Sequence, residues 1–364
     1  MTESLRDQLA AVVEPQVGRP IGELGFLGAV DEAARRVELV LPVSEWPHRA
    51  ALEAEVDRIA PGAVVAVRAM DEAERLALRN HLRAAMTADP GPGHHAEPTP
   101  RFLDRSSRTR VLGVSSGKGG VGKSSVTVNL AVALAAAGRR VGLLDADVYG
   151  FSIPKMMGAS SDPVVLGDLV IPTLVHGVRC VSMGYFVPDE QPVIWRGPML
   201  HKAIQQLVTE AWWDEPDFLL IDMPPGTGDV ALTLSEVVPR VEMYVVTTPQ
   251  PAAQRVAQRS AYAARKLKLA VRGVVENMSW FTGDDGVRYE IFGAGGGAQL
   301  ARELGVPLLA QVPLDPRLRA GGDTGHPIVV SDPDAEASRI FTELAATVVA
   351  QGPSRVYRQE LTVR

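Results

Sequence analysis

The sequence predicts an α/β protein: a doubly wound, mostly parallel sheet preceded by a small α+β domain. Three observations lead to this prediction. Short apolar runs alternate with helix-compatible stretches beyond residue 108, which is typical of a parallel sheet covered on both faces. A segment rich in Pro and Gly separates this part from the residues before it. A glycine-rich loop joins the first apolar run to the first long helix.

The domain boundaries follow from the composition of one segment. Residues 88–100 are dominated by Pro and Gly and have no periodicity, so we expect a linker over 88–107. It separates a small domain at 1–87 from a larger domain at 108–352, and residues 353–364 form a C-terminal tail. The 364 residues are enough for one large domain and one smaller one.

The elements of both domains follow from apolar periodicity. In the small domain we expect helices at Ser4–Val13, Pro47–Ile59 and Asp71–Ala85, with strands at Arg36–Leu41 and Ala63–Val67. In the large domain a helix is expected at Val126–Ala137, ending at Gly138. The large-domain strands are expected at Val111–Val114, Val141–Leu144, Cys180–Met183, Phe218–Ile221, Met243–Thr247, Val271–Val275 and Leu308–Val312.

Composition narrows the class of protein. The net charge of −6 leaves no general basic field, and no basic patch stands out, so we expect no nucleic-acid partner. There is no run of eighteen apolar residues and no apolar segment of a secretory signal, so we expect a cytoplasmic protein without a membrane partner. Cys180 is the single cysteine, which excludes an intrachain disulfide.

The glycine-rich loop reads Gly-Lys-Gly-Gly-Val-Gly-Lys-Ser over residues 117–124 and predicts a phosphate-binding loop, and hence a P-loop NTPase domain. Backbone N–H groups close around phosphate oxygens there, Lys123 reaches the β/γ-phosphates, and Ser124 ligates Mg²⁺. Lys118 is not part of the general template. A merely flexible turn does not explain this pair of lysines. The residues expected to hold the nucleotide are Gly117, Gly119, Gly120, Val121, Gly122, Lys123, Ser124 and Ser125.

Polar residues follow three other strands. Asp145 and Asp147 come after the second strand, where carboxylates can hold Mg²⁺ or orient an attacking water; the alternative is a pair that caps a loop. Asp222 ends an apolar strand, as in a Walker B motif, and Pro224–Asp229 can act as a switch. Asn277 follows a further strand, and its amide suits recognition of adenine.

Together these motifs resemble the Mrp/ApbC family of P-loop ATPases, described as iron–sulfur cluster carriers and related to the deviant Walker A ATPases MinD and ParA. The resemblance runs from about Val111 to Val330, and the segment from Gly18 to Gly25 resembles the small FeS-assembly-associated domain fused to this family. The motifs are Lys118–Ser124, Asp145–Gly150, Trp195–Met199, Ile221–Asp229, Thr247–Gln250, Val275–Ser279 and Ile291–Gly297.

The resemblance implies a homodimeric ATPase with ATP and Mg²⁺ as cofactors and apoprotein clients or FeS-assembly proteins as partners. It implies that Lys118 reaches the partner's nucleotide and that Asp147 serves hydrolysis, so the expected catalytic set is Lys118, Lys123, Asp147 and Asp222. The expected Mg²⁺ set is Ser124, Asp145 and Asp222. Trp195-Arg196 could lie at the dimer interface.

One departure from the family concerns its cargo. A Cys-x-x-Cys usually follows the Glu-Asn-Met-Ser segment, but here Trp280–Val287 has no cysteine. Clusters commonly need four thiolates, and Cys180, in an apolar strand, supplies one per subunit. Asp284 and Asp285 are expected to form an exposed turn rather than a cation site. Two functions stay open: an ATP-hydrolysing cluster carrier that borrows ligands, or a cargo-free, nucleotide-gated switch. A membrane- or DNA-positioning ATPase is disfavoured.

Overall fold

The structure is a computed structural model, and it describes residues 4–87, 100–104, 107–148, 150–186, 197–226, 228–238 and 240–354. Among these residues, no helix is both long and apolar enough to cross a membrane. The chain divides into two units. Unit 1 comprises Met1–Ser107, Ser160–Leu174 and Thr209–Glu215, and unit 2 comprises Arg108–Ala159, Val175–Val208 and Pro216–Arg364.

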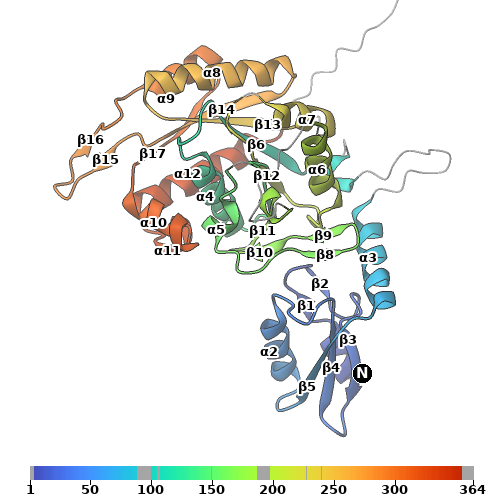
Figure 1. Cartoon of the computed structure of the whole chain (residues 1–364). Coiled ribbons are helices and arrows are strands. Elements are labelled where there is room, and N and C mark those ends of the chain that lie inside the picture. The colour runs from blue at the N-terminus through green and yellow to red at the C-terminus, as the bar shows by residue number, and fades with distance from the viewer. Residues whose placement is uncertain are drawn as a thin grey trace, which may run out of the picture. The chain divides into compact units, whose positions relative to one another are not determined.

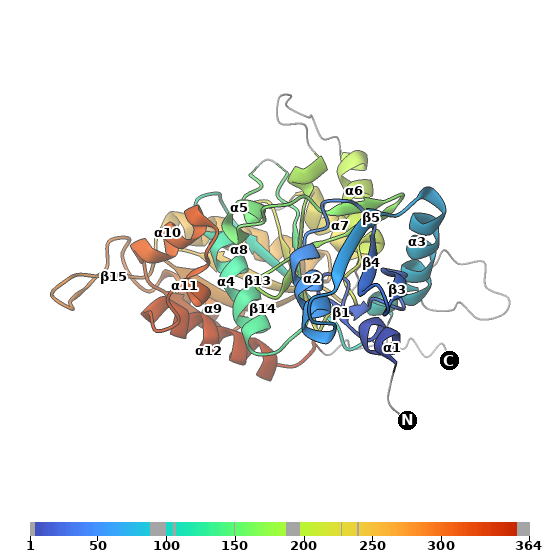
Figure 2. The same ribbon diagram turned by 90° about the horizontal axis from the view of Figure 1, so that it is seen from below.

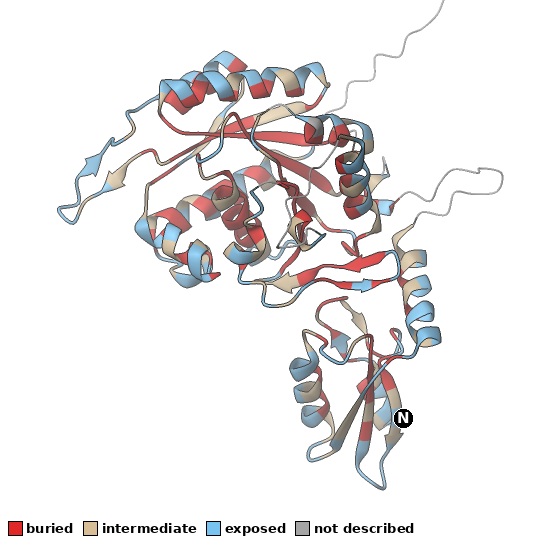
Figure 3. Cartoon of the chain, in the orientation of Figure 1, coloured by how far each residue is buried: buried red, intermediate tan, exposed pale blue. Residues whose placement is uncertain are grey.

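The largest sheet has eight strands in the order β10-β11-β7-β12-β6-β13-β14-β17, and the seven strands from β11 to β17 form the centre of unit 2 (Figure 1). The pairings from β11 to β17 are parallel. Every residue of β6, β7, β11, β12 and β13 is buried, as expected for strands covered on both faces (Figure 3). The α/β prediction is therefore confirmed. The strands are β6 (Arg110–Ser116), β7 (Val141–Asp145), β10 (Thr173–Val175), β11 (Val178–Ser182), β12 (Phe218–Asp222), β13 (Glu242–Thr247), β14 (Ala270–Asn277) and β17 (Leu308–Val312).

Helices cover both faces of this sheet. On one face α4 (Lys123–Ala136) packs against α12 (Glu336–Ala350), and Figure 2 shows them side by side. On the other face α8 (Pro251–Lys266) packs against α9 (Gly296–Leu304). Alternate residues of β13 divide between the two cores, since Tyr244 and Val246 join the first and Val245 the second. The other helices of unit 2 are α5 (Ile153–Met157), α6 (Gly197–Glu210), α7 (Asp229–Val237), α10 (Pro316–Thr324), α11 (Ile328–Ser331) and the 3₁₀ helix η2 (Met183–Phe186).

The register of the parallel strands brings their carboxyl ends together. Asp222 of β12 lies opposite Asp145 of β7, and Asp145 lies opposite Ser182 of β11. On the other side of β12, Asp222 lies opposite Val114 of β6, which continues into the glycine-rich loop. Polar residues that are far apart in the sequence therefore meet at the edge where parallel α/β sheets bind ligands.

Unit 1 is built on a three-stranded sheet in the order β3-β4-β5. The predicted strands and the second and third helices are present, but the first helix ends at Ala10 because Val13 pairs with Pro20 in a two-stranded ribbon. Strand β3 was not predicted. The elements are α1 (Leu5–Ala10), β1 (Val13–Glu14), β2 (Arg19–Pro20), β3 (Leu27–Asp31), β4 (Arg36–Leu41), α2 (Arg49–Ile59), β5 (Val64–Ala69), α3 (Glu72–Met86) and the 3₁₀ helix η1 (Arg101–Leu103).

Two segments beyond the expected linker complete the core of unit 1. The hairpin of β8 (Val164–Leu166) and β9 (Leu169–Ile171) buries apolar side chains in the same cluster as α2 and β4. Trp212 is buried in that cluster, and its Nε1 donates a hydrogen bond of 2.8 Å to the carbonyl of Val17. A domain boundary placed at residues 88–107 does not anticipate these segments. A composition rich in Pro and Gly indicates a connecting stretch of chain, but it does not indicate which later segments pack onto unit 1. Residues 88–99 and 105–106 of the expected linker, and 355–364 of the expected tail, lie outside the described residues.

Candidate functional site

The glycine-rich loop between β6 and α4 has a backbone that few other residues could adopt. Gly122 has a φ of 76°, in the left-handed region, and an added Cβ would collide with the amide of Asn277. A Cβ on Gly117 would collide with the backbone of Val256 and Ala257. Helix α4 begins at Lys123, within the last two residues of the loop motif, so its unpaired N–H groups lie at the loop, as a phosphate site requires.

The loop lines a cavity of about 750 Å³. Seven of the eight residues expected to hold the nucleotide line this cavity, and Gly117 lies behind it against α8. The volume is within the range of cavities that hold small-molecule ligands. The lining residues are Ser116, Lys118, Gly119, Gly120, Val121, Gly122, Lys123, Ser124, Ser125, Asp147, Gly150, Met156, Leu200, Pro224, Pro225, Gly228 and Val230.

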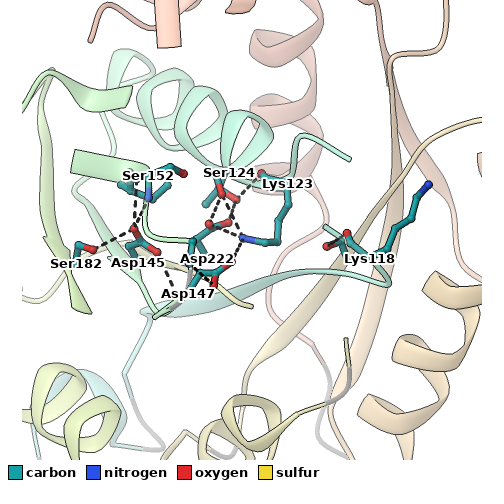
Figure 4. A network of polar contacts seen from close by, with 12 residues as sticks. Lys118, Lys123, Ser124, Asp145, Asp147, Ser152, Ser182 and Asp222 are labelled. Atoms are coloured by element: carbon teal, nitrogen blue, oxygen red, sulfur yellow. Dashed lines mark hydrogen bonds and ion pairs between the residues drawn. The ribbon is translucent and has the colours of Figure 1, made fainter. Parts of the chain in front are cut away.

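At the base of the loop, three side chains of α4 converge on Asp222 (Figure 4). Lys123 Nζ lies 2.5 Å from Oδ2 of Asp222, and Ser124 Oγ donates to the same oxygen at 2.6 Å. Thr127 Oγ1 donates to Oδ1 at 2.7 Å. Lys123 and Asp222 are buried, so they form a desolvated ion pair. Thr127 was not among the predicted site residues, although it follows Lys123 by one helical turn and so shares its face.

Asp145 and Asp147 differ in what they face. The carboxylate of Asp145 accepts hydrogen bonds from the backbone N–H of Asp147, Ser152 and Ile153 and from Ser182 Oγ (Figure 4). Burial, together with the charge of Asp222, raises the pKa of Asp145 to about 7. Asp145 thus fixes the loop that carries Asp147.

Asp147 lines the cavity instead. Its Oδ2 lies 4.0 Å from Lys123 Nζ, and its Oδ1 accepts a hydrogen bond from the N–H of Gly150.

Lys118 and Asn277 occupy different places around the loop. Lys118 points away from the Lys123–Asp222 pair (Figure 4), and its Nζ lies 3.3 Å from Oε1 of Gln250, at the start of α8. Asn277 is buried, and its Nδ2 donates to the carbonyl of Val121 at 2.9 Å. In this structure Asn277 braces the loop, and its recognition of adenine stays a prediction.

The stretch Trp280–Val287, where the family that the motifs resemble usually has Cys-x-x-Cys, lies in a hairpin here. The hairpin consists of β15 (Phe281–Thr282) and β16 (Arg288–Tyr289). Its turn is closed by Asp285, which accepts hydrogen bonds from Val287 N–H and the Tyr289 hydroxyl. Cys180 lies elsewhere, fully buried in β11, and burial raises the pKa of its thiol far above the usual range. Within the described residues, no group of three or more His, Cys, Asp or Glu could hold a metal ion.

Some predicted features lie outside the described residues. Trp195-Arg196 belongs to the segment 187–196, and Thr227 of the expected switch is also outside. The described part of that switch contacts its surroundings through Gly226, whose N–H donates to the Ser116 carbonyl and whose carbonyl accepts from Ser260 Oγ.

A family model described as "NUBPL iron-transfer P-loop NTPase" matches residues 107–349. The chain belongs to this family. A curated relative from Mycobacterium tuberculosis, named iron-sulfur cluster carrier protein, is 41% identical over 360 residues, which cover 95% of this chain and 92% of that protein. A relative of the same name from Bacillus subtilis is 38% identical, over 86% of this chain and 88% of its own.

Solved structures of P-loop NTPases are similar to this chain. The nucleotide-binding protein of Archaeoglobus fulgidus in complex with ADP is 33% identical with a TM-score of 0.55, covering 64% of this chain and 93% of that one. MinD of Pyrococcus horikoshii with Mg-ADP is 25% identical with a TM-score of 0.53, covering 68% of this chain and 100% of its own. The resemblance inferred from the motifs is confirmed, and nucleotide binding follows from the fold and the loop.

Proposed function

We propose that this member of the iron-transfer P-loop NTPase family hydrolyses ATP with Mg²⁺ as a homodimer. The observation that carries the proposal is the convergence of Lys123, Ser124 and Thr127 on Asp222 beside a cavity lined by the glycine-rich loop. These groups are the cation, hydroxyl and carboxylate that phosphoryl transfer from a nucleotide requires.

The residues present fit Mg²⁺. Ser124 Oγ and the carboxylate of Asp222 are hard oxygen ligands that already lie 2.6 Å apart. We propose that Ser124 and Asp222 hold the ion, which when bound neutralises charge on the β- and γ-phosphates. Asp145 was expected in this set. Its hydrogen bonds to the loop at 147–153 support a positioning role within it.

Asp147 is the residue we propose to act on the attacking water. It lines the cavity, and its carboxylate is held by Gly150 N–H and lies 4.0 Å from Lys123 Nζ. A carboxylate in this place can accept a hydrogen bond from water and orient it toward the γ-phosphate. When the nucleotide binds, we expect Lys123 to move from Asp222 to the phosphates. Lys123 then faces the negative phosphates and Asp222 faces Mg²⁺, so each residue keeps a group of opposite charge beside it.

Two observations support a homodimer built on the face of the cavity. Lys118 lines the cavity but is directed away from Lys123, as expected for a lysine that serves a nucleotide across an interface (Figure 4). Exposed apolar side chains, Phe151, Met199 and Leu232, each lie within two residues of a cavity-lining residue. Burying them on dimerisation would remove apolar surface from water.

The test is ATP turnover with Mg²⁺, measured beside nucleotide binding for two lysine variants. Lys123→Ala should lose nucleotide binding, because the buried cation that meets the phosphates is gone. Lys118→Ala should keep binding and lose turnover, because only the contact across the dimer is removed. Equal loss of binding in both variants, or fast turnover by a monomer, would contradict the proposal. We expect turnover to be slow without a partner protein.

The cargo has two candidate explanations. The names of the relatives support a carrier that binds and transfers iron–sulfur clusters, with ligands borrowed from a partner or a small thiol. The burial of Cys180, which keeps its thiol protonated and inaccessible, favours a cargo-free, nucleotide-gated switch. Anaerobic reconstitution with iron and sulfide separates the two. Cluster absorbance in the presence of glutathione supports the carrier, and retained ATPase activity without absorbance supports the switch.

A further inference from the structure

Helix α8 presents a basic stripe on its exposed side. Arg255, Arg259, Tyr262 and Lys266 follow one another at intervals of four, three and four residues, so they lie on one face. All four are exposed (Figure 3 shows the exposed side of α8 in blue). Between the outermost two, the helix rises about 16 Å. We call these four residues the α8 stripe.

The stripe carries a local excess of positive charge. Residues 251–268 contain five Arg and Lys and no Asp or Glu, although the whole chain has a net charge of −6. Arg255, Arg259 and Lys266 form no ion pair in the described part of the chain. Glu303 of α9 contacts Gln254 and Gln258 on the neighbouring face of α8 and forms no ion pair with the stripe residues, so its charge offsets the three cations only in part. These cations lie four and seven residues apart in the sequence, so they gather into one patch only when the helix forms.

The opposite side of α8 contacts three parts of the nucleotide site. Gly117 packs against the backbone of Val256 and Ala257 so closely that a Cβ there would collide. Gln250, the N-cap residue of α8, lies 3.3 Å from the amine of Lys118. Ser260 Oγ donates to the carbonyl of Gly226, in the expected switch segment, at 3.0 Å.

We propose that the α8 stripe docks an acidic amphipathic helix of a protein partner, and that this docking is linked to the nucleotide state. The proposal goes beyond the proposed ATPase, and its nucleotide linkage rests on that function. In this proposal α8 contacts the P-loop and the switch on one side and the partner on the other. If α8 shifts between nucleotide states, the affinity for the partner differs between those states. The bound partner then changes the relative affinity for the two nucleotides by the same factor.

An acidic polypeptide fits the stripe better than a nucleic acid does. Tyr262, which is 42% exposed, lies between the cations of the stripe, and Val256, which is 36% exposed, flanks Arg255 at its edge. Leucine-like side chains of a helix can cover this apolar surface. A phosphate backbone has no such groups. Nucleic-acid binding also draws on a wide basic field, whereas the stripe itself has three cations on a chain of net charge −6.

The test uses a fluorescent helical peptide with glutamates at positions i, i+4, i+7 and i+11 and leucines between them. Its binding to the full-length protein is measured by anisotropy at about 0.15 M salt, where exposed charges are screened beyond roughly 8 Å. The triple variant Arg255→Glu, Arg259→Glu, Lys266→Glu should bind the peptide about tenfold more weakly or worse, because attractive pairs become repulsive. ATP turnover should stay within about twofold of wild type, since none of the three lines the cavity.

A matched control reverses the same number of exposed cations elsewhere, at Arg36, Arg75 and Arg108. It should leave peptide binding within about twofold, as expected for distant sites. A second peptide of the same composition, with its glutamates spread around the helix, should bind more weakly. Equal weakening in both triple variants, no binding by the wild type, or tighter binding of duplex DNA than of the peptide through the stripe would overturn the docking proposal.

The linkage is tested by measuring peptide affinity with Mg-ADP and with a non-hydrolysable ATP analogue. The two affinities should differ by about threefold or more, within the usual range of couplings between sites. Ser260→Ala should keep peptide binding but reduce this difference. Identical affinities in both nucleotide states would overturn the linkage. Loss of ATPase activity in a protein that still binds the peptide would instead count against the proposed function and leave the docking surface standing.

Discussion

Replacing Lys123 by methionine tests whether its buried ion pair with Asp222 stabilises the folded protein in the absence of nucleotide. The side chains are 6% and 0% exposed and lie 2.5 Å apart, so removing the lysine leaves a carboxylate in the interior without its counter-charge. Such changes cost about 3–5 kcal/mol. Ser124 and Thr127 still donate to Asp222, so we expect the lower end, about 3 kcal/mol.

The assay is calorimetric unfolding without nucleotide and with EDTA, so that lost ligand binding does not contribute. For a unit of this size, about 3 kcal/mol corresponds to a fall in Tm of roughly 6–12 °C. Lys123→Met combined with Asp222→Asn should recover at least half of the fall, because residue 222 then carries no buried charge that lacks its partner. Lys155→Met, at an exposed lysine, is the control and should shift Tm by less than about 1 °C. A shift below about 2 °C for Lys123→Met, or a double variant no better than the single one, would refute this reasoning.

Three further predictions follow from the described contacts. Since its raised pKa keeps Cys180 a neutral, buried thiol, native protein at pH 8 should react with a thiol reagent at least about a hundredfold more slowly than unfolded protein; comparable rates would contradict its burial. Gly122→Ala should weaken nucleotide binding by more than about tenfold, because alanine is strained in the left-handed region and its Cβ would collide with Asn277. Gly138→Ala is the control: its φ of 75° brings the same strain, but the space around it is open, so nucleotide binding should be unchanged. Trp212→Phe removes the hydrogen bond to the Val17 carbonyl and should destabilise unit 1 by about 1 kcal/mol, seen as faster limited proteolysis of the N-terminal region; unchanged cleavage would contradict this.

The sequence predicted the parts of the fold in which local pattern and burial agree. Strands such as Phe218–Asp222 are continuous apolar runs ending in a carboxylate, and the structure places that carboxylate where the pattern indicates. Short strands with mixed exposure were harder. Strand β3 was not predicted because Leu27–Asp31 mixes apolar residues with small and polar ones. Its pairing with β4 determines its conformation.

The candidate site could be predicted as a set of residues but not as a set of contacts. The phosphate-binding loop and Asp222 carry their chemistry in their sequence. Asp145 and Asp147 do not, because two carboxylates one residue apart become a buried anchor and a cavity-lining group only through the packing of Ser182 and the loop at 150–153. Thr127 and the α8 stripe likewise needed the helix to bring separated residues onto one face.

The discontinuous core of unit 1 has a consequence for synthesis on the ribosome. Residues 4–107 are made first, but the hairpin at 164–171 and Trp212, which share their hydrophobic cluster, follow much later. At about 5–20 residues per second, the roughly one hundred residues in between delay completion of that core by about 5–20 s. The nascent chain therefore exposes an incomplete apolar surface until Trp212 has emerged, and we expect chaperones to bind the N-terminal segment during that interval.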